Sequence, residues 1–359
     1  MKFQVFRHGD RTHDKYPDES YPTDPYRNNS FYPIGFGGLT NQGKCRLYNF
    51  GTSLRERYDR FLGDVYFPAD VKVISTDKSR TKMSLETVLV SLYPPKGEQV
   101  WKRGFDWQPI PINYAPKSED PFFMYWTCPM YKAEFKCARQ TPKYRQELSH
   151  FDGLMRSLTN YTGRHCRDTE FIYYLYHTLT AQSFLNLPLP AWTRPYFPNG
   201  PIIDAALLEY DFMSYNTRMK RLNGGMSLRK VLDDMSVVMD EGAREKPKVH
   251  LYSAHENNIA GILQTLNLWK RVIPEYTSAV IFELYQENVE HYIKVVYFKG
   301  IPAEYEVRRL PGCSEYCPLE RFLRITRNVV PINVTEECFG ESHETYKFSQ
   351  PITRLRWEG

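Results

Sequence analysis

The chain has 359 residues, with 47 lysines and arginines against 42 aspartates and glutamates and a net charge of +5. A chain of this length buries roughly three quarters of its unfolded surface in a core. The charges are spread along the chain, which favours an anion-attracting cleft and argues against nucleic acid as a partner. No apolar run has the length of a bilayer-crossing helix, so we expect no membrane span.

An apolar stretch from Phe3 to Phe6 ends in a charged turn that contains Arg7, His8 and Arg11. This pattern predicts a buried strand with a turn at its carboxyl end, where α/β proteins form ligand clefts. Each arginine can present a forked, permanently charged guanidinium to a tetrahedral anion. The histidine between them has a ring nitrogen that can attack phosphorus or carry a proton. Taken alone, the same string is more often a solvated basic turn.

Two later segments have the same build. Residues 71–74 read as a strand, and Arg80 falls in the first turn of the helix that follows. Residues 249–252 read as another strand and are followed by His255 and Glu256. Three strand ends of this kind predict a common cleft that contains three arginines, two histidines and one carboxylate.

Strand and helix signals alternate at the start of the chain, are lost after residue 111 and return with a helix near residue 226. We predict an α/β core formed by residues 1–111 and 225–359. Residues 112–224 show helical spacing only, which predicts a mostly helical insert, or cap, domain. Residues 279–285 and 292–298 alternate apolar and polar positions and predict an antiparallel hairpin at the edge of the sheet.

The predicted insert opens with an aromatic cluster at 122–126. Packing between the insert and the core accounts for most of these side chains. Alternatively, one or two of them line the roof of a ligand pocket, with Phe122 and Trp126 as the candidates.

Seven cysteines are present, and none belongs to a pair of zinc-type C-x-x-C knuckles, so we expect no metal site. Cys313 and Cys317 flank a short turn and can close a local loop. Glycosylation sequons begin at Asn28, Asn160 and Asn333. Cysteines of this type together with sequons favour a secreted, extracellular protein.

Four motifs occur in the order found in histidine acid phosphatases: R-H-G-D-R-T at 7–12, S-T-D-x-x-R-T at 75–81, W-Q-P-I-P at 107–111 and S-A-H-E at 253–256. The chain therefore resembles that family along essentially its whole length. Residues 21–26 and 39–44 resemble its insect secreted branch, above all the salivary acid-phosphatase-like proteins of fleas. The resemblance implies a histidine-phosphatase-like sheet core with helices on both faces.

The resemblance also implies roles for the residues of the three strand ends. His8 attacks phosphorus and forms a phosphohistidine, and Glu256 stands where the family's proton donor stands. The phosphoryl oxygens are held by Arg7, Arg11, Arg80 and His255. The arginines supply the positive charge, so neither a metal nor another cofactor is expected. Relatives of this kind usually carry aspartate at the position of Glu256, and the extra methylene can misplace the carboxyl by about an ångström.

The family resemblance further implies a long-range disulfide between Cys128 and Cys338. Cys137 and Cys166 then remain as a further pair. Cys45 is left as a free, buried and inert thiol in a helix.

Two functions follow, and we prefer the first. The resemblance to flea salivary proteins implies a secreted binder that sequesters small mediators, such as serotonin and cysteinyl leukotrienes, with little or no phosphatase activity. A protonated amine needs a carboxylate such as Asp10 or Glu256 and an aromatic wall. The alternative is an active secreted acid phosphatase that hydrolyses phosphomonoesters through His8.

Overall fold

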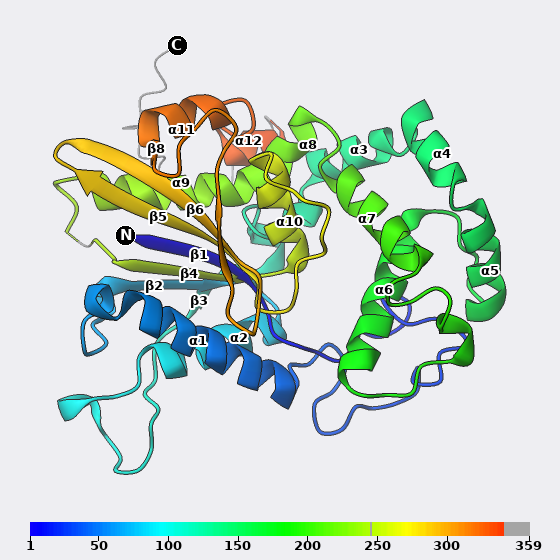
Figure 1. Cartoon of the computed structure of the whole chain (residues 1–359), viewed down its shortest axis with the longest axis horizontal. Coiled ribbons are helices and arrows are strands. Elements are labelled where there is room, and N and C mark those ends of the chain that lie inside the picture. Colours follow the sequence, from blue (N-terminus) through cyan, green and yellow to red (C-terminus); the bar gives the residue numbers. More distant parts are fainter. Residues whose placement is uncertain (245, 341–359) are drawn as a thin grey trace.

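A computed structural model describes residues 1–244 and 246–340 and shows one mixed sheet with helices on both faces (Figure 1). The sheet has eight strands, in the order β3-β2-β4-β1-β5-β6-β7, with β8 paired to β6. The strands are β1 (Lys2–Arg7), β2 (Val71–Ser75), β3 (Asn113–Tyr114), β4 (Val249–Ala254), β5 (Ala279–Glu287), β6 (Glu290–Phe298), β7 (Tyr305–Arg308) and β8 (Cys317–Pro318). The α/β prediction is confirmed.

The central strands β2, β4 and β1 run parallel, which brings their carboxyl ends to one edge of the sheet. Arg7 at the end of β1 pairs with Ala254 at the end of β4, and Ser75 at the end of β2 pairs with Ser253. The residues that follow these three ends therefore meet, as the sequence pattern predicted.

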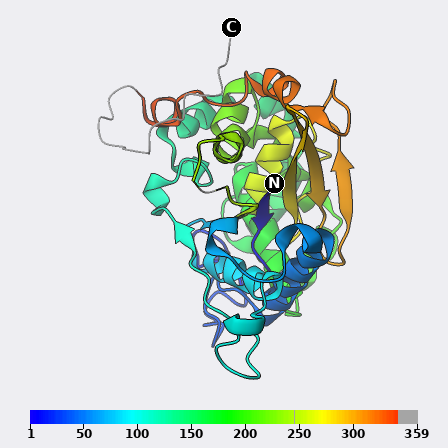
Figure 2. The ribbon, with the colours of Figure 1, turned by 90° about the vertical axis from the view of Figure 1, so that its left-hand side faces the viewer.

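Alternation along β1 divides the core into two layers, because successive side chains of a strand point to opposite faces. Phe3 and Val5 pack on one face beneath α9 (Gly224–Met239), α10 (Glu256–Thr265) and α11 (Leu319–Thr326). Phe6 packs on the other face against α1 (Asn41–Leu62) and α2 (Ser79–Leu92). Figure 2 shows the sheet between these two groups of helices.

The hairpin of β5 and β6 is present, but it does not form the sheet edge. Strand β5 pairs antiparallel with β1, while β7 and β8 both pair with β6 on the other side. The sequence reading missed β7, whose four residues are too few to show a clear alternation.

A group of helices lies beside the sheet, at the right of Figure 1. They are α3 (Pro129–Ala138), α4 (Pro142–Ser149), α5 (Asp152–Thr162), α6 (Thr169–Phe184), α7 (Pro201–Met213) and α8 (Thr217–Leu222). A last short helix, α12 (Val334–Phe339), contacts α3. None of the helices in the described part of the chain is long and apolar enough to cross a membrane.

A second chain segment, the loop between β1 and α1, packs against this group of helices. The backbone N–H of Ser20 donates to Thr178 of α6 at 3.0 Å, and Gln182 of α6 donates to the Asp24 carboxylate, also at 3.0 Å. We therefore propose that the cap consists of residues 14–38 together with most of 112–224. The short strand β3 belongs to the sheet, and residues 341–359 of the predicted core lie outside the described residues.

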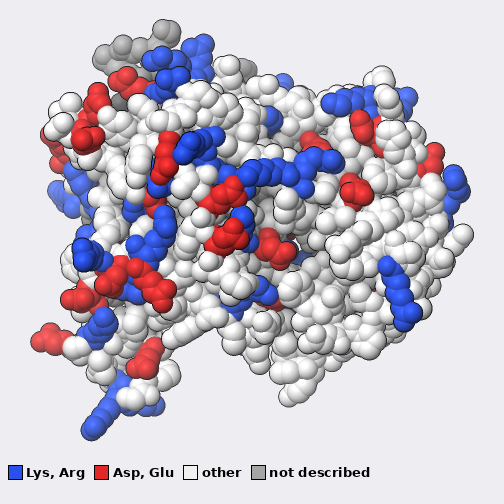
Figure 3. Space-filling model, in the orientation of Figure 1, with Lys and Arg blue, Asp and Glu red and all other residues white. Residues whose placement is uncertain are grey.

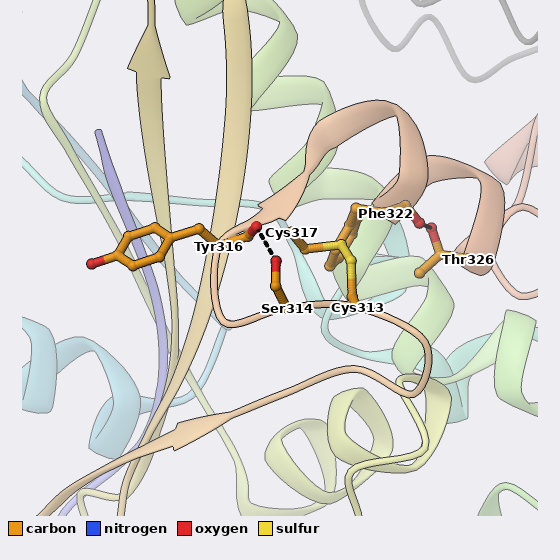
Figure 4. Close-up of a disulfide and its surroundings, with 6 residues drawn as sticks. All are labelled: Cys313, Ser314, Tyr316, Cys317, Phe322 and Thr326. Carbon is orange, nitrogen blue, oxygen red and sulfur yellow. Dashed lines mark hydrogen bonds between the residues drawn. A yellow bond between two sulfur atoms is a disulfide. The ribbon is translucent and has the colours of Figure 1, made fainter.

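The predicted Cys313–Cys317 disulfide is present, with the two Cα atoms 5.4 Å apart. Ser314 within the bridged loop donates from its hydroxyl to the Tyr316 carbonyl at 2.6 Å (Figure 4). The bridge thus closes a tight turn directly before α11.

The other two predicted pairs are not bonded in this structure. Cys128 and Cys338 nevertheless lie side by side in one buried cluster, where the Cys128 thiol donates to the Cys338 carbonyl at 3.2 Å and also interacts with the Cys338 thiol, so this pairing stays a prediction. Cys137 is exposed on α3, whereas Cys166 is buried in a different cluster under α5 and α6, so these two do not pair. Cys45 is free as predicted, but it is exposed rather than buried.

Candidate active site

A cavity of about 830 Å³ lies where the carboxyl ends of the parallel strands face the cap. The core contributes charged and polar groups from the three predicted turns, namely Arg11, Arg80, His255 and Glu256. The cap contributes both charged side chains and a set of aromatic ones, among them Trp126, Tyr131, Phe135 and Tyr173. On the face of the molecule shown in Figure 3, charges of both signs are interspersed.

His8 is fully buried, and both of its ring nitrogens have partners. Nδ1 lies 2.8 Å from the Gly9 carbonyl, and Nε2 accepts a hydrogen bond of 3.2 Å from Nε of Arg80. Burial and the charges of Arg80 and Arg7 hold the pKa of His8 well below its ordinary value. The ring is therefore neutral, with its proton on Nδ1 and a lone pair on Nε2 available for attack.

A close contact between two glycines positions the turn that carries His8. A Cβ on Gly9 would lie 2.7 Å from the Gly43 carbonyl oxygen, and a Cβ on Gly43 would lie 2.4 Å from the Asp10 carbonyl oxygen. Gly43 is in the first turn of α1, which begins after the N-cap Thr40. The first turn of α1 is thus in direct backbone contact with the residues that follow His8.

Arg7 has hydrogen-bonding capacity that the described residues do not use. Its Nη1 donates to the Pro274 carbonyl at 2.6 Å, and its guanidinium lies 4.0 Å from the centre of the Tyr276 ring. Its Nε and Nη2 atoms are buried and make no hydrogen bond with the described residues, although Nε faces Glu256 in an ion pair at 3.4 Å. Buried donors left in this state favour a bound anion.

Two carboxylates of the loop 14–38 hold the other predicted arginines. Nη1 and Nη2 of Arg11 donate to the two oxygens of Glu19 at 2.7 and 2.5 Å. Arg80 lies 3.4 Å from the Asp14 carboxylate. An incoming anion must therefore compete with Glu19 for Arg11. The sequence analysis missed both carboxylates, because they lie in a loop without a periodic pattern.

His255 stands beside His8, with the ring centres 5.5 Å apart. Its Nε2 lies 3.1 Å from the Thr76 hydroxyl. The Trp126 ring contacts the His255 ring edge-on, with the two ring centres 5.4 Å apart. Burial and the charge of Arg80 lower the pKa of His255 to about 3. His255 is thus a neutral hydrogen-bonding group at the pH of most biological fluids.

Glu256 begins α10 and is held from two sides. Its Oε2 lies 3.4 Å from Nε of Arg7, and its Oε1 accepts a 2.8 Å hydrogen bond from the Tyr173 hydroxyl. His177 is 3.9 Å from the same Oε1 atom. Burial raises the pKa of Glu256, but the charge of Arg7 outweighs this effect and holds the pKa well below its ordinary value. Glu256 is therefore a carboxylate in this arrangement.

Ring nitrogens of His8 and His255 and a carboxylate oxygen of Glu256 all lie within 4.8 Å of one another. Such a set has the composition of a metal site, but Arg7 and Arg80 carry permanent positive charge beside it. Two guanidinium groups favour an anion over a cation at this point.

The three predicted ligand residues have different outcomes. Trp126 lines the cavity as predicted. Phe122 packs against the core cluster beneath α9 instead, since it lies on the core side of the 122–126 segment. Asp10 is outside the cavity lining, and its buried carboxylate accepts hydrogen bonds of 2.8 and 3.3 Å from Arg46 of α1.

Comparisons with known proteins agree with this geometry. The profile of the histidine phosphatase superfamily (branch 2) matches residues 4–298. A venom acid phosphatase of Apis mellifera is 41% identical over 93% of this chain and 86% of its own length. Human lysosomal acid phosphatase is 34% identical over 93% of this chain and 78% of its own length.

The fold is shared with more distant solved structures. A Hafnia alvei phytase in complex with myo-inositol hexakis sulphate superposes with a TM-score of 0.68 at 16% identity, covering 92% of this chain and 96% of the phytase. The span matched by the family profile, residues 4–298, includes the strand ends that carry His8 and His255. The chain is therefore a member of branch 2 of the histidine phosphatase superfamily.

Proposed function

We propose that the protein is an acid phosphatase that hydrolyses phosphomonoesters through a phosphohistidine on His8. The observation that carries the proposal is the state of His8, a neutral ring with its Nε2 lone pair beside Arg80 and its proton directed to the Gly9 carbonyl. This tautomer suits a nucleophile, and the hydrogen bond at Nδ1 stabilises the positive charge that develops on the ring.

The first chemical step is transfer of the phosphoryl group to His8. Nη2 of Arg7, with Arg80 and with Arg11 once released from Glu19, binds the phosphoryl oxygens. Nε2 attacks phosphorus and an N–P bond forms while the bond to the ester oxygen breaks. The leaving oxygen takes the proton of the Glu256 carboxyl and departs as an alcohol.

The proton on Glu256 comes with the substrate, because Arg7 keeps this side chain ionised until the phosphate binds. Below its second pKa of about 6, a phosphomonoester still carries one proton. Transfer of that proton to Glu256 becomes favourable when the phosphate brings its negative charges into the site, because nearby negative charge raises the pKa of a carboxyl.

Hydrolysis of the phosphohistidine reverses these roles. A water molecule attacks phosphorus, and Glu256, now a carboxylate, accepts its proton. The N–P bond breaks, Nε2 of His8 recovers its lone pair, and inorganic phosphate leaves with the proton from Glu256, which becomes a carboxylate again.

Turnover of p-nitrophenyl phosphate at pH 5 tests the proposal, together with an alkaline quench and mass spectrometry to detect phosphohistidine on the His8 peptide. We expect turnover and a phosphorylated peptide. Absence of turnover, or turnover that persists in His8→Ala, contradicts the proposal.

A second candidate function is sequestration of aromatic amines such as serotonin. The observation that favours it is the aromatic wall of the cavity, where Trp126, Tyr131 and Phe135 lie with the carboxylates of Glu209 and Glu256. Aromatic faces together with a carboxylate bind an organic cation. Isothermal calorimetry with serotonin tests it, and the phosphatase remains our preferred function because the arginines and histidines serve an anion.

We also propose that the protein is secreted. The Cys313–Cys317 disulfide supports this placement, because such bonds persist in oxidising compartments. All three sequon asparagines, Asn28, Asn160 and Asn333, are exposed. Glycan mapping of protein purified from its source tests the proposal, and absence of a glycan at all three sites argues against it.

A further inference from the structure

Helix α6 of the cap presents two polar side chains to the Glu256 carboxylate. The Tyr173 hydroxyl donates to Oε1 at 2.8 Å, and Nε2 of His177, one helical turn further on, lies 3.9 Å from the same atom. Residues four apart lie on the same face of a helix. Both side chains are buried, so the contact is shielded from water.

The two oxygens of the Glu256 carboxylate thus contact different parts of the protein, one the core and the other the cap. Arg7 of β1 lies beside Oε2, while Tyr173 and His177 lie beside Oε1. The other titratable groups that interact with Glu256 come from the surrounding core and cap elements, namely His8, Arg80, Tyr125, Tyr210 and His255. The hydrogen bond from Tyr173 at Oε1 and the ion pair with Arg7 at Oε2 together orient the carboxylate.

The carboxyl group of a catalytic glutamate needs to be held in one position. Its carboxyl lies at the end of three rotatable side-chain bonds, and an error of about 1 Å in the position of a catalytic group can cost about a hundredfold in rate. We propose that Tyr173 and His177 are positioning residues, which hold the Glu256 carboxyl where it can pass a proton to the leaving oxygen. The inference rests on the proposed phosphatase function and deepens it.

His177 serves this role as a neutral group. Burial lowers its pKa to about 4, although the charge of Glu256 opposes the effect. Its Nε2 lies 3.1 Å from the Tyr210 hydroxyl, and its Nδ1 is buried without a hydrogen-bond partner among the described residues. A protonated histidine at this place would keep Glu256 ionised and oppose protonation of the carboxyl.

Packing is the competing explanation for Tyr173, because its ring also contacts Tyr174, His177 and Tyr210. The two explanations differ for Tyr173→Phe, which keeps the ring and removes only the hydroxyl. A packing role predicts a silent variant, whereas a positioning role predicts a defect in proton transfer.

The experiment compares wild type, Tyr173→Phe and Tyr176→Phe on an alkyl phosphate, glycerol 2-phosphate. Tyr176 is on the same helix and outside the cavity lining, so its variant is a matched control. We expect kcat to fall about tenfold in Tyr173→Phe and to stay unchanged in Tyr176→Phe, with inhibition by inorganic phosphate unchanged in both.

The leaving group provides a second readout. Release of p-nitrophenolate needs little help from a proton, so the burst rate with p-nitrophenyl phosphate should fall much less in Tyr173→Phe than turnover of the alkyl ester. Equal losses on both substrates, or no loss on either, overturn the inference. His177→Gln should show the same selective loss on the alkyl ester, and a His177→Gln that loses both equally overturns the part of the inference that concerns His177.

Carbon-13 NMR of the Glu256 carboxyl separates this inference from the proposed function. A hydrogen bond to the ionised form lowers a carboxyl pKa, so Tyr173→Phe should raise the pKa of Glu256 and Tyr176→Phe should leave it unchanged. If wild type hydrolyses neither ester, the proposed function fails. In that case a raised pKa of Glu256 in Tyr173→Phe still supports the hydrogen bond between Tyr173 and Glu256. An unchanged pKa of Glu256 contradicts it.

Discussion

Nε2 of His8 accepts a hydrogen bond from Nε of Arg80 at 3.2 Å. The bond directs a permanent positive charge toward the ring nitrogen, so in the proposed reaction the same guanidinium orients the ring first and faces the phosphoryl oxygens afterwards. His8 follows β1, and Arg80 is in the first turn of α2, which follows β2. Strand β4 lies between β1 and β2, so this contact joins residues from two strands that are not neighbours in the sheet.

Replacement of His8 by alanine removes the nucleophile and leaves the arginines in place. We expect hydrolysis to fall about a thousandfold or more, because loss of a catalytic nucleophile has effects of this size. Phosphate binding, measured by calorimetry, should change by only a few-fold. A matched control is His250→Phe, which alters another buried histidine far from the cavity and should keep its turnover. Substantial turnover in His8→Ala would falsify the assignment.

Replacement of Glu19 by glutamine weakens the ion pair that occupies Arg11. We expect inorganic phosphate to inhibit about tenfold more strongly, because a freed guanidinium gains charge-assisted hydrogen bonds to the anion. Asp18→Asn removes the same charge from an exposed neighbour in the same loop and serves as the control. A similar gain in both variants would mean that general charge, and not the release of Arg11, determines phosphate affinity.

The pH dependence of kcat/KM should reflect the proton that the substrate brings. Above the second pKa of the ester, about 6, this proton is lost and kcat/KM should decrease about tenfold per pH unit. An ester with a lower second pKa should show the decrease at correspondingly lower pH. If the decrease in kcat/KM occurs at the same pH with both esters, it reports the titration of a group of the protein and not of the substrate.

His250 should make folding stability depend on pH. Burial lowers its pKa to about 3, whereas the unfolded chain has a value near 6.5. Between these values the unfolded state binds more protons, so stability is full above pH 6.5 and decreases on acidification, by about 1.4 kcal/mol per pH unit. His250→Phe removes this term. Urea unfolding should therefore show the variant gaining stability relative to wild type between pH 6.5 and 4.5.

Trp126 tests the amine-binding candidate. Loss of a desolvated indole from a ligand contact costs on the order of 2 kcal/mol. We expect Trp126→Ala to weaken serotonin binding at least about tenfold and His8→Ala to change it little. Calorimetry on both variants is the measurement. The opposite pattern, with loss only in His8→Ala, would place the amine among the arginines instead.

The residues at the strand ends were predictable because a short apolar run followed by arginine or histidine is a local signal. Arg7, His8, Arg80 and His255 all follow strands that the sheet brings into register. Tyr173 gave no such signal. Helix α6 is buried on most sides, so its sequence lacks the polar stripe that would mark one face as special.

The surroundings of Asp10 were not predictable for a related reason. A carboxylate two residues after His8 looks like part of a site, but its partner Arg46 is 36 positions further along the chain. Only the fold shows that α1 returns to this turn. The sequence likewise gave no sign that Glu19 would lie against Arg11.

The two-segment cap has a consequence for recombination between relatives. Because Ser20 and Asp24 are bonded to Thr178 and Gln182 of α6, transplanting residues 112–224 alone would join a foreign helix to a resident loop. Such chimeras would leave buried polar groups unmatched at the seam. Exchange of residues 14–38 together with the insert keeps the seam intact, so crossover points that respect both segments are the ones expected to yield folded hybrids.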